Sequence, residues 1–480
     1  MSGWGEGYVT DMRYIDAVQQ DALPANLAAA LTLRRRRAPD FSRPFRALDL
    51  GCGSGLTALG IAAANPQAEV VGVDFTPDHI LEARDAVAAI GLRNARFEEA
   101  SFADLLERPE ALGVFDLVIC HGVLSWISAE NRARVVEILR RHTATGAMVF
   151  LGYNAMPGWA AAAPFRGLVT RLARTRAGAD RVQAVGESYA ALMRLAEAGV
   201  GHMAENALLK GWLATLTERP PEYLAHEYLP EDATAFWHDD IAAEMANARL
   251  QFAAAARLAE NFDDFMIPEP MREILADAER RGCGETIRDF CANRTFRSDI
   301  FARGAPKLGE EAAQRAFAGL AIAAYTPADR PVEVRRSGQT PAPVDPALTR
   351  PTLALLEERP DSVGGLIERA AAAGLDRGAA AKTVIALMAS GAAEPLATRE
   401  PSAEAVAACA AFNRVAVAES WPALASPQLG GAASAGEIER AMLTGDDDPS
   451  ADGEADETTR EHRASRRALF DARRALFPAP

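Results

Sequence analysis

Short apolar segments alternate with amphipathic segments between Arg46 and about Phe150. The apolar segments predict five buried strands, at residues 47–50, 70–73, 95–97, 115–120 and 147–151. The amphipathic segments predict helices between them, at residues 57–64, 78–89 and 131–142. Strands and helices that alternate at this spacing form an open parallel sheet with helices on both faces. We therefore expect an α/β fold for this part of the chain.

The alternation stops at about Ala161, where the sequence becomes rich in Ala, Leu, Glu and Arg. Helices are predicted in this middle part at residues 165–177, 187–198, 207–217, 241–259 and 270–280. Three short helices and a strand are expected over 352–396, and a basic amphipathic helix over 460–476. The origin of the sixth and seventh strands of the sheet stays open. They either follow Tyr153 directly or return after the helical part.

A chain of 480 residues is too long for one ordinary domain. We expect four parts: an α/β core over 1–160, a helical cap and dimer contact over 161–325, a proline-rich linker over 326–350, and a small winged-helix-like domain with an acidic loop over 351–480. The candidate second helix of that last domain, at 377–390, carries only Arg377 and Lys382 as cations. A helix that contacts DNA bases is more basic, so no nucleic-acid partner is expected.

Composition narrows the classes of function. The net charge of −15 does not attract phosphate backbones or anionic lipids. Five widely separated cysteines predict reduced thiols in the cytoplasm rather than disulfides or a zinc site. No apolar run reaches the length of a membrane span, so no membrane insertion is expected. His226 and Glu227 lack the H-E-x-x-H spacing, so no metal is assigned.

The loop after the first strand carries the strongest chemical signal, with the sequence Asp49-Leu50-Gly51-Cys52-Gly53-Ser54-Gly55. Glycines at this place let a ligand approach the backbone at the end of a parallel strand. Asp74 ends the second strand, where an acid accepts hydrogen bonds from ribose hydroxyls. We therefore expect a nucleotide-like cofactor at this edge.

The glycine spacing alone does not identify the nucleotide. Leu56 stands where a dinucleotide motif has its third glycine, but Gly53-x-Gly55-x-x-Ala58 satisfies a looser form of that motif. Asp49 favours a cationic ligand, because its carboxylate opposes a pyrophosphate. S-adenosylmethionine carries a sulfonium and an ammonium group and no phosphate, so Asp49 favours it over NAD.

These motifs resemble those of a known family. Asp49 to Gly55 is similar to motif I of the class I methyltransferases, and Val73-Asp74 to their ribose-binding acid. A narrower resemblance joins the chain to bacterial methyltransferases with a methyltransferase regulatory domain, through residues 115–126, 153–159, 223–229 and 296–299. It spans about Tyr8 to Gly304. That group includes rickettsial protein-lysine methyltransferases.

The resemblance implies S-adenosylmethionine as cofactor and a set of residues around it. The candidate cofactor-binding residues are Asp49, Gly51, Gly53, Gly55, Asp74, Phe75, Ser101, Phe102, His121 and Gly122. Many relatives place an adenine-binding Asp near Ser101, and here Glu99 or Asp104 takes its place. An Asn that relatives carry soon after the glycine loop is missing.

The candidate catalytic residues are His121, Tyr14, Trp126 and Tyr153. His121, Trp126 and Tyr153 are expected to face the methyl donor, whereas Tyr14 lies before the first strand, in a segment that in similar enzymes often closes over the cofactor. Aromatic faces stabilise a sulfonium by cation–π attraction. His121 is also a candidate base or a packing histidine. A tryptophan at the position of Trp126 is more often a core or lid anchor, and packing on the sheet is the alternative for Tyr14.

Three functions fit these observations: a protein methyltransferase acting on lysine, a small-molecule methyltransferase with a helical cap, and a catalytically silent scaffold. The large accessory regions and the acidic surface favour a protein acceptor. The intact Asp49, glycines and Asp74 argue against the scaffold. No motif encodes the acceptor itself, because specificity resides in the shape of the pocket.

Overall fold

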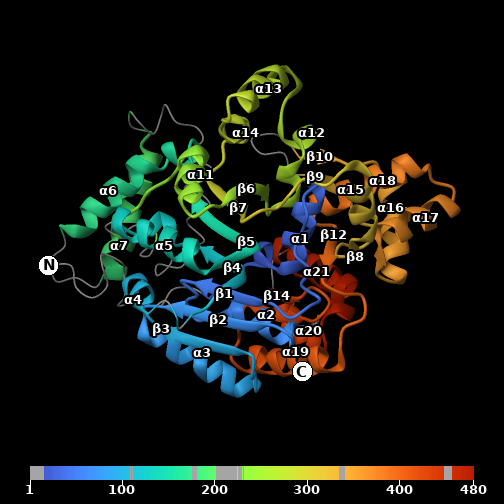
Figure 1. The fold of residues 1–480 in the computed structure, drawn as a ribbon, viewed down its shortest axis with the longest axis horizontal. Helices are drawn as coiled ribbons and strands as arrows, with labels where there is room; N and C mark the ends of the chain where they lie inside the picture. The colour runs from blue at the N-terminus through green and yellow to red at the C-terminus, as the bar shows by residue number, and fades with distance from the viewer. Residues whose placement is uncertain are drawn as a thin grey trace.

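A seven-stranded sheet lies at the centre of the protein, in a computed structural model (Figure 1). The structure describes residues 16–108, 110, 112–175, 181–199, 201, 224, 227, 230, 232–334, 341–447 and 457–480. The strand order is β3-β2-β1-β4-β5-β7-β6. The first five strands pair in parallel: β1 (Arg46–Leu50), β2 (Glu69–Asp74), β3 (Ala95–Glu99), β4 (Phe115–His121) and β5 (Thr143–Asn154). The predicted α/β fold is confirmed.

Helices cover both faces of the sheet. One face packs against α1 (Pro24–Leu33), α2 (Leu56–Ala64) and α3 (Pro77–Ile90). The other face packs against α4 (Phe102–Glu107), α5 (Ala129–His142) and α11 (His238–Asn247). Side chains alternate along each strand. In β4, Ile119 therefore joins the first core and Val118 the second.

The last two strands return after the helical insertion. The strand β7 (Phe296–Ala302) runs antiparallel to both β5 and β6 (Gln251–Ala255). The predicted helix over 241–259 is therefore wrong in its second half. Helix α11 ends at Asn247, and Arg249 adopts a left-handed φ of 59° before the chain extends into β6. Pairing with β7 outweighs the helix propensity of the alanines in this segment.

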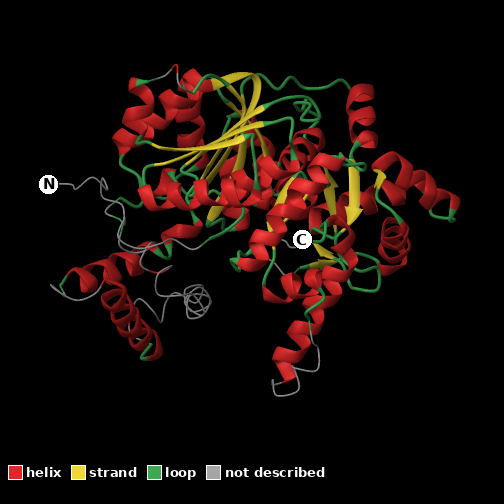
Figure 2. Cartoon of the chain, turned by 90° about the horizontal axis from the view of Figure 1, so that it is seen from below, coloured by secondary structure: helices red, strands yellow, loops and turns green. Residues whose placement is uncertain are grey.

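Among the described residues, the helical region contains two separate apolar units. Helices α6 (Ala163–Arg174) and α7 (Arg181–Glu197) share a small apolar core and extend away from the sheet (Figure 2). Helices α12 (Asp263–Met266), α13 (Arg272–Arg280) and α14 (Gly284–Ala292) share another. The predicted helix over 207–217 lies outside the described residues. Short 3-10 helices link these parts: η1 (Gln20–Ala22), η3 (Leu124–Trp126), η4 (Gly158–Ala160), η5 (Leu258–Asn261) and η6 (Glu269–Met271).

A second, three-stranded sheet follows, in the order β11-β8-β12. Its elements are α15 (Glu310–Gly319), β8 (Ala321–Ala324), α16 (Pro346–Glu358), β11 (Asp361–Ser362), α17 (Val363–Ala372), α18 (Arg377–Ser390) and β12 (Ala393–Leu396). The central strand β8 precedes all three helices α16, α17 and α18, whereas a winged helix pairs β12 with a strand that follows it. The winged-helix prediction is not confirmed. Within the expected linker, β9 (Glu333–Val334) pairs with β10 (Ala342–Pro343).

The final segment packs onto helices α2 and α3, which cover one face of the large sheet. It contains α19 (Ala403–Ala418), β13 (Ala423–Ser426), β14 (Gly431–Ser434), α20 (Glu437–Thr444), α21 (Glu457–Arg473) and η8 (Arg474–Leu476). A Cβ at Gly60 of α2 would lie 2.5 Å from the Cβ of Ala432, so the hairpin rests directly on that helix. Most of the acidic loop lies outside the described residues. Among the helices that the structure describes, none has the length and apolar character needed to cross a membrane.

Candidate functional site

The glycine loop lies at the carboxyl ends of the parallel strands, where open α/β sheets bind ligands. Gly51 and Gly55 have φ values of 78° and 80°, which glycine adopts without strain. A Cβ at Gly51 would also lie 2.5 Å from Val123. Gly53 has a φ of 55°, and no atom lies within 4 Å of its would-be Cβ. The backbone at Gly53 is therefore open to close approach by a ligand.

Asp74 is fixed at the end of β2 by three donors. Its Oδ2 accepts from the Gly53 amide at 3.0 Å, and its Oδ1 accepts from the Thr76 amide at 2.9 Å. The Nδ1 of His79 lies 3.5 Å from Oδ1. Burial acts to raise the pKa of Asp74, but these donors outweigh it and lower that pKa. The carboxylate is thus ionised at neutral pH and held in a fixed orientation at the end of β2.

Asp49 is a buried acid of β1, with only 6% of its surface exposed. It pairs in register with Gly72 and Ile119. Burial, aided by the charge of Asp74, raises its pKa to about 7. An acid in this state favours a nearby cation, because a positive charge repays the cost of ionising a buried carboxyl.

The expected adenine side lies beyond the end of β3. The Ala100 amide donates to the Asp74 carbonyl at 3.0 Å, so Ser101 and Phe102 lie close to Asp74 along the chain. Ser101 caps α4, and its hydroxyl lies 2.7 Å from Oδ2 of Asp104. Asp104, a candidate for the adenine amino contact, is therefore held by Ser101. Phe102 packs against the second core.

Phe75 and Gly122 complete the candidate cofactor residues. Phe75 follows Asp74 directly and is partly buried. Gly122 has a φ of 65° and open space at its would-be Cβ, and its amide donates to the Gly152 carbonyl at 3.0 Å. Both lie at the same sheet edge as the glycine loop.

His121 ends β4 on the face that carries Asp49. Its ring stacks on Phe150 at 5.8 Å and lies 5.3 Å from Phe296. Burial and the charge of Arg257 lower its pKa to about 4. The imidazole is therefore neutral at pH 7, and it is a weaker base than an ordinary histidine. This geometry suits an aromatic wall better than a general base.

Trp126 and Tyr14 have different outcomes. Trp126 lies in η3 and is partly buried, with the Arg166 guanidinium 6.0 Å from its ring. The Ser125 hydroxyl accepts from the Asn154 amide at 2.8 Å and anchors η3 to β5. Tyr14 lies outside the described residues.

Tyr153 does not face the donor site, which corrects the prediction made for it. It is fully buried and belongs to the second core, on the opposite face of the sheet from His121. Its hydroxyl donates to Oδ2 of Asp299 at 2.6 Å. The strict alternation of side chains along β5 explains this, since Gly152 faces His121 and the next residue faces away.

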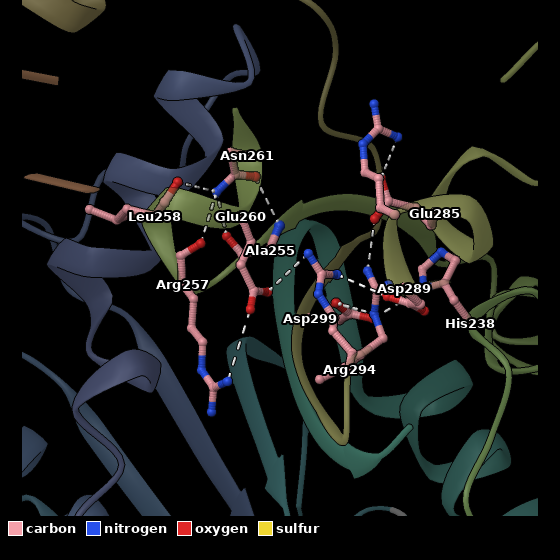
Figure 3. Close-up of polar contacts among 12 residues, drawn as sticks. His238, Ala255, Arg257, Leu258, Glu260, Asn261, Glu285, Asp289, Arg294 and Asp299 are labelled. Atoms are coloured by element: carbon pink, nitrogen blue, oxygen red, sulfur yellow. Dashed lines mark hydrogen bonds and ion pairs between the residues drawn. The ribbon is translucent and has the colours of Figure 1, made fainter. Parts of the chain in front are cut away.

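A buried polar cluster surrounds Asp299, and Figure 3 shows part of it. Arg297 is fully buried and pairs with Asp299 at 2.8 Å, Glu285 at 2.9 Å and Asp289 at 2.5 Å. His238 Nδ1 lies 3.2 Å from Asp299. Burial acts to raise the pKa of Asp299, but the charge of Arg297 lowers it below its ordinary value. The cluster joins α14 to β7 and α11.

Several residues of the site escaped the sequence analysis. Asp16 accepts from the Ser54 hydroxyl at 2.6 Å and so reaches the glycine loop from the N-terminal segment. His79 and Arg257 carry no motif. The position of His79, in the first turn of the helix that follows Asp74, is a signal from which its closeness to Asp74 could have been predicted.

The residues present fit S-adenosylmethionine. The open backbone at the glycine loop allows close approach of the cofactor. The ionised Asp74 suits its ribose hydroxyls, and the buried Asp49 suits its cationic end. In the described part of the chain, no three His, Cys, Asp or Glu side chains gather as metal ligands do.

Comparison with known proteins agrees with this site. Residues 48–149 match the family model of a methyltransferase domain, and residues 220–303 that of a predicted methyltransferase regulatory domain. The chain thus carries an S-adenosylmethionine-dependent methyltransferase domain followed by a methyltransferase regulatory domain. This methyltransferase is 29% identical over 448 residues to an uncharacterized protein of Synechocystis sp., covering 92% of this chain and 87% of that one.

Two further likenesses extend beyond the methyltransferase domain. An uncharacterized protein of Rickettsia prowazekii is 27% identical over 314 residues, and the chain spans 55% of its length. The solved structure of PKMT2 from Rickettsia typhi in complex with AdoHcy has a TM-score of 0.70 at 18% identity, covering 90% of this chain and 88% of that chain. That likeness shows a shared fold, including the accessory regions.

Proposed function

We propose that this methyltransferase transfers methyl groups to lysine amines of proteins. The observation that carries the proposal is the extent of the likeness to PKMT2, which includes the regions outside the methyltransferase domain. A small-molecule enzyme needs only a pocket, whereas a protein acceptor needs a surface. The net charge of −15 favours a basic acceptor segment.

In this proposal each site residue has a role in binding or orientation. Gly51, Gly53 and Gly55 allow close approach of the methionine part, and Asp49 faces its cationic end. Asp74 accepts the ribose hydroxyls. S-adenosylmethionine supplies a reactive methyl group on a sulfonium, so positioning and exclusion of water provide most of the acceleration. His121, stacked on Phe150, forms an aromatic wall at the end of β4.

Two aspects of the proposal concern the whole protein. The helices of 161–304 form a dimer contact. Light scattering tests this by measuring the molar mass in solution, and the mass of a monomer would contradict it. The protein acts in the cytoplasm, an expectation supported by five cysteines that are all free.

The experiment is transfer of a tritiated methyl group from S-adenosylmethionine to cell-extract proteins. After acid hydrolysis, label is expected in methyllysines. The Asp74→Ala variant is the control for transfer at this site. Label found only in small molecules would contradict a protein acceptor and favour the capped small-molecule enzyme.

A further inference from the structure

The turn after β6 is rigid and reaches the N-terminal segment. The Asn261 side chain donates to the Ala255 carbonyl at 2.8 Å and accepts from the Ala255 amide at 3.0 Å. The Asn26 amide group donates to the carbonyls of Asp21 at 2.8 Å and Ala256 at 2.9 Å. In Figure 3 the Arg257 side chain extends away from Asn261. The turn therefore presents Arg257 from a fixed backbone.

This turn lies at the same edge of the sheet as the cofactor loop. Strand β6 is antiparallel to β7, which is antiparallel to β5, so β6 ends at the edge where β4 and β5 end. Phe296 begins β7 at that edge, opposite Asn154. Its ring lies 5.3 Å from that of His121. Arg257 and Phe296 thus stand beside the end of β4, on the side away from β1.

Arg257 is held loosely between two carboxylates. Its Nε lies 3.4 Å from Oδ2 of Asp21, and its Nη1 lies 3.9 Å from Oε1 of Glu260. The guanidinium carbon is 6.0 Å from the centre of the Phe296 ring. These distances exceed those of strong charged hydrogen bonds, and 46% of the Arg257 side chain is exposed.

Glu260 is better buried than its partner. Only 11% of its side chain is exposed, and its Oε2 accepts no hydrogen bond from the residues the structure describes. The Nη2 of Arg294 lies 3.5 Å from that oxygen. A buried carboxylate with incomplete hydrogen bonding favours an additional cationic donor.

We propose that Asp21, Glu260 and the Phe296 ring form the entry site for the ammonium group of an acceptor lysine, which the Arg257 guanidinium fills while no acceptor is bound. Carboxylates and an aromatic face are the groups that recognise a cation. An entering lysine displaces a weakly held side chain. Arg257 therefore limits the apparent affinity for the acceptor, because only the displaced state binds it.

An alternative role for Arg257 is contact with the carboxylate of the methyl donor. The strand order argues against it. Strand β6 is four strands from β1, which is roughly 19 Å at the usual spacing between strands. In the proposed function the methionine part of the donor lies over the glycine loop after β1. Arg257 consequently stands on the acceptor side of the end of β4.

The test uses the full chain, polylysine as acceptor and tritiated methyl transfer as readout. Replacement of the guanidinium in Arg257→Met is expected to lower the KM for polylysine about two- to fivefold, the worth of an exposed ion pair. Asp21→Asn is expected to raise that KM about tenfold. The affinity for S-adenosylmethionine, measured by calorimetry, stays unchanged in both and shows that each variant is folded.

Arg272→Met is the matched control, because Arg272 is 50% exposed and pairs with Asp264, and neither residue belongs to the proposed site. The site rests on the proposed lysine acceptor, and the outcomes separate the two. A wild type that labels no lysine removes the proposed function and the site with it. A wild type that labels polylysine, with KM unchanged in both variants, overturns the site alone. Loss of donor affinity in Arg257→Met would assign Arg257 to the donor instead.

Discussion

The Tyr153 hydroxyl lies 2.6 Å from Oδ2 of Asp299, and both side chains are fully buried. This hydrogen bond ties the end of β5 to the middle of β7. Burial and the charge of Asp299 raise the pKa of the phenol well above 10. Tyr153 is thus a neutral structural donor between the sheet and the cluster around Arg297, and it has no access to a substrate.

Tyr153→Phe tests that structural role. The variant leaves Asp299 with one donor fewer, which is expected to lower the free energy of unfolding by about 1–3 kcal/mol. The kcat is expected to stay near that of the wild type. Urea unfolding and methyl transfer measure the two effects, and Tyr189→Phe in α7 is the control. A large fall in kcat with an unchanged free energy of unfolding would show that Tyr153 acts in catalysis and contradict the structural role.

Arg297→Met tests the buried cluster. Removal of this guanidinium leaves Asp299, Glu285 and Asp289 without their shared cation. Breaking a buried ion pair in this way is expected to cost about 3–5 kcal/mol of unfolding free energy. Thermal unfolding should show a clear fall in Tm. An unchanged Tm would mean that the cluster contributes little to the attachment of α14 and β7.

Asp49→Asn is expected to stabilise the protein without cofactor and to weaken cofactor binding. The folded pKa of Asp49 is about 7, above the ordinary aspartate value of 3.8. The folded state therefore binds the proton more tightly, and stability falls as the pH rises from about 4 to about 7. The shift corresponds to at most roughly 4 kcal/mol.

The pH dependence provides the check on Asp49. Unfolding at pH 8 should occur at a higher temperature in Asp49→Asn than in the wild type, whereas at pH 4 the two should agree. If the wild type and Asp49→Asn were equally stable at both pH values, ionisation of Asp49 would not lower the stability of the folded state.

His121→Phe separates an aromatic wall from a general base. A phenyl ring keeps the stacking on Phe150, so kcat is expected to fall less than about tenfold. Loss of a general base costs about 10²–10⁴-fold. The rate of the wild type, measured against pH, should show no inflection near pH 6.5, because the pKa of His121 is about 4. The pH profile of His121→Phe should therefore have the same shape near that pH. A fall in kcat of about 10²-fold or more would contradict the role of His121 as an aromatic wall.

Much of the large sheet was predictable from the sequence. Local apolar periodicity located β1 to β5, because each strand is buried and bounded by loops. It failed at β6, whose alanines form a strand only because β7 lies beside them. The three-stranded sheet could not be predicted from local patterns either, because β8 precedes the expected linker and its partners β11 and β12 follow it.

The candidate site shows the same division. Asp49, the glycines and Asp74 occupy short, local motifs. Arg257, Glu260 and Asp21 reach the site through tertiary contacts that no spacing encodes. Tyr153 was misplaced because its face of β5 depends on strand register, which the local pattern leaves open.

Calorimetric titration with S-adenosylmethionine tests the cofactor site most directly, using the wild type, Asp74→Ala and Asp78→Ala. Asp78 is an exposed acid of the first turn of α3 and is the matched control. Micromolar binding is expected for the wild type and the control, with a loss of about tenfold or more in Asp74→Ala, which lacks the acceptor for the ribose hydroxyls. Absence of binding by the wild type, or equal affinity in Asp74→Ala, would contradict the site.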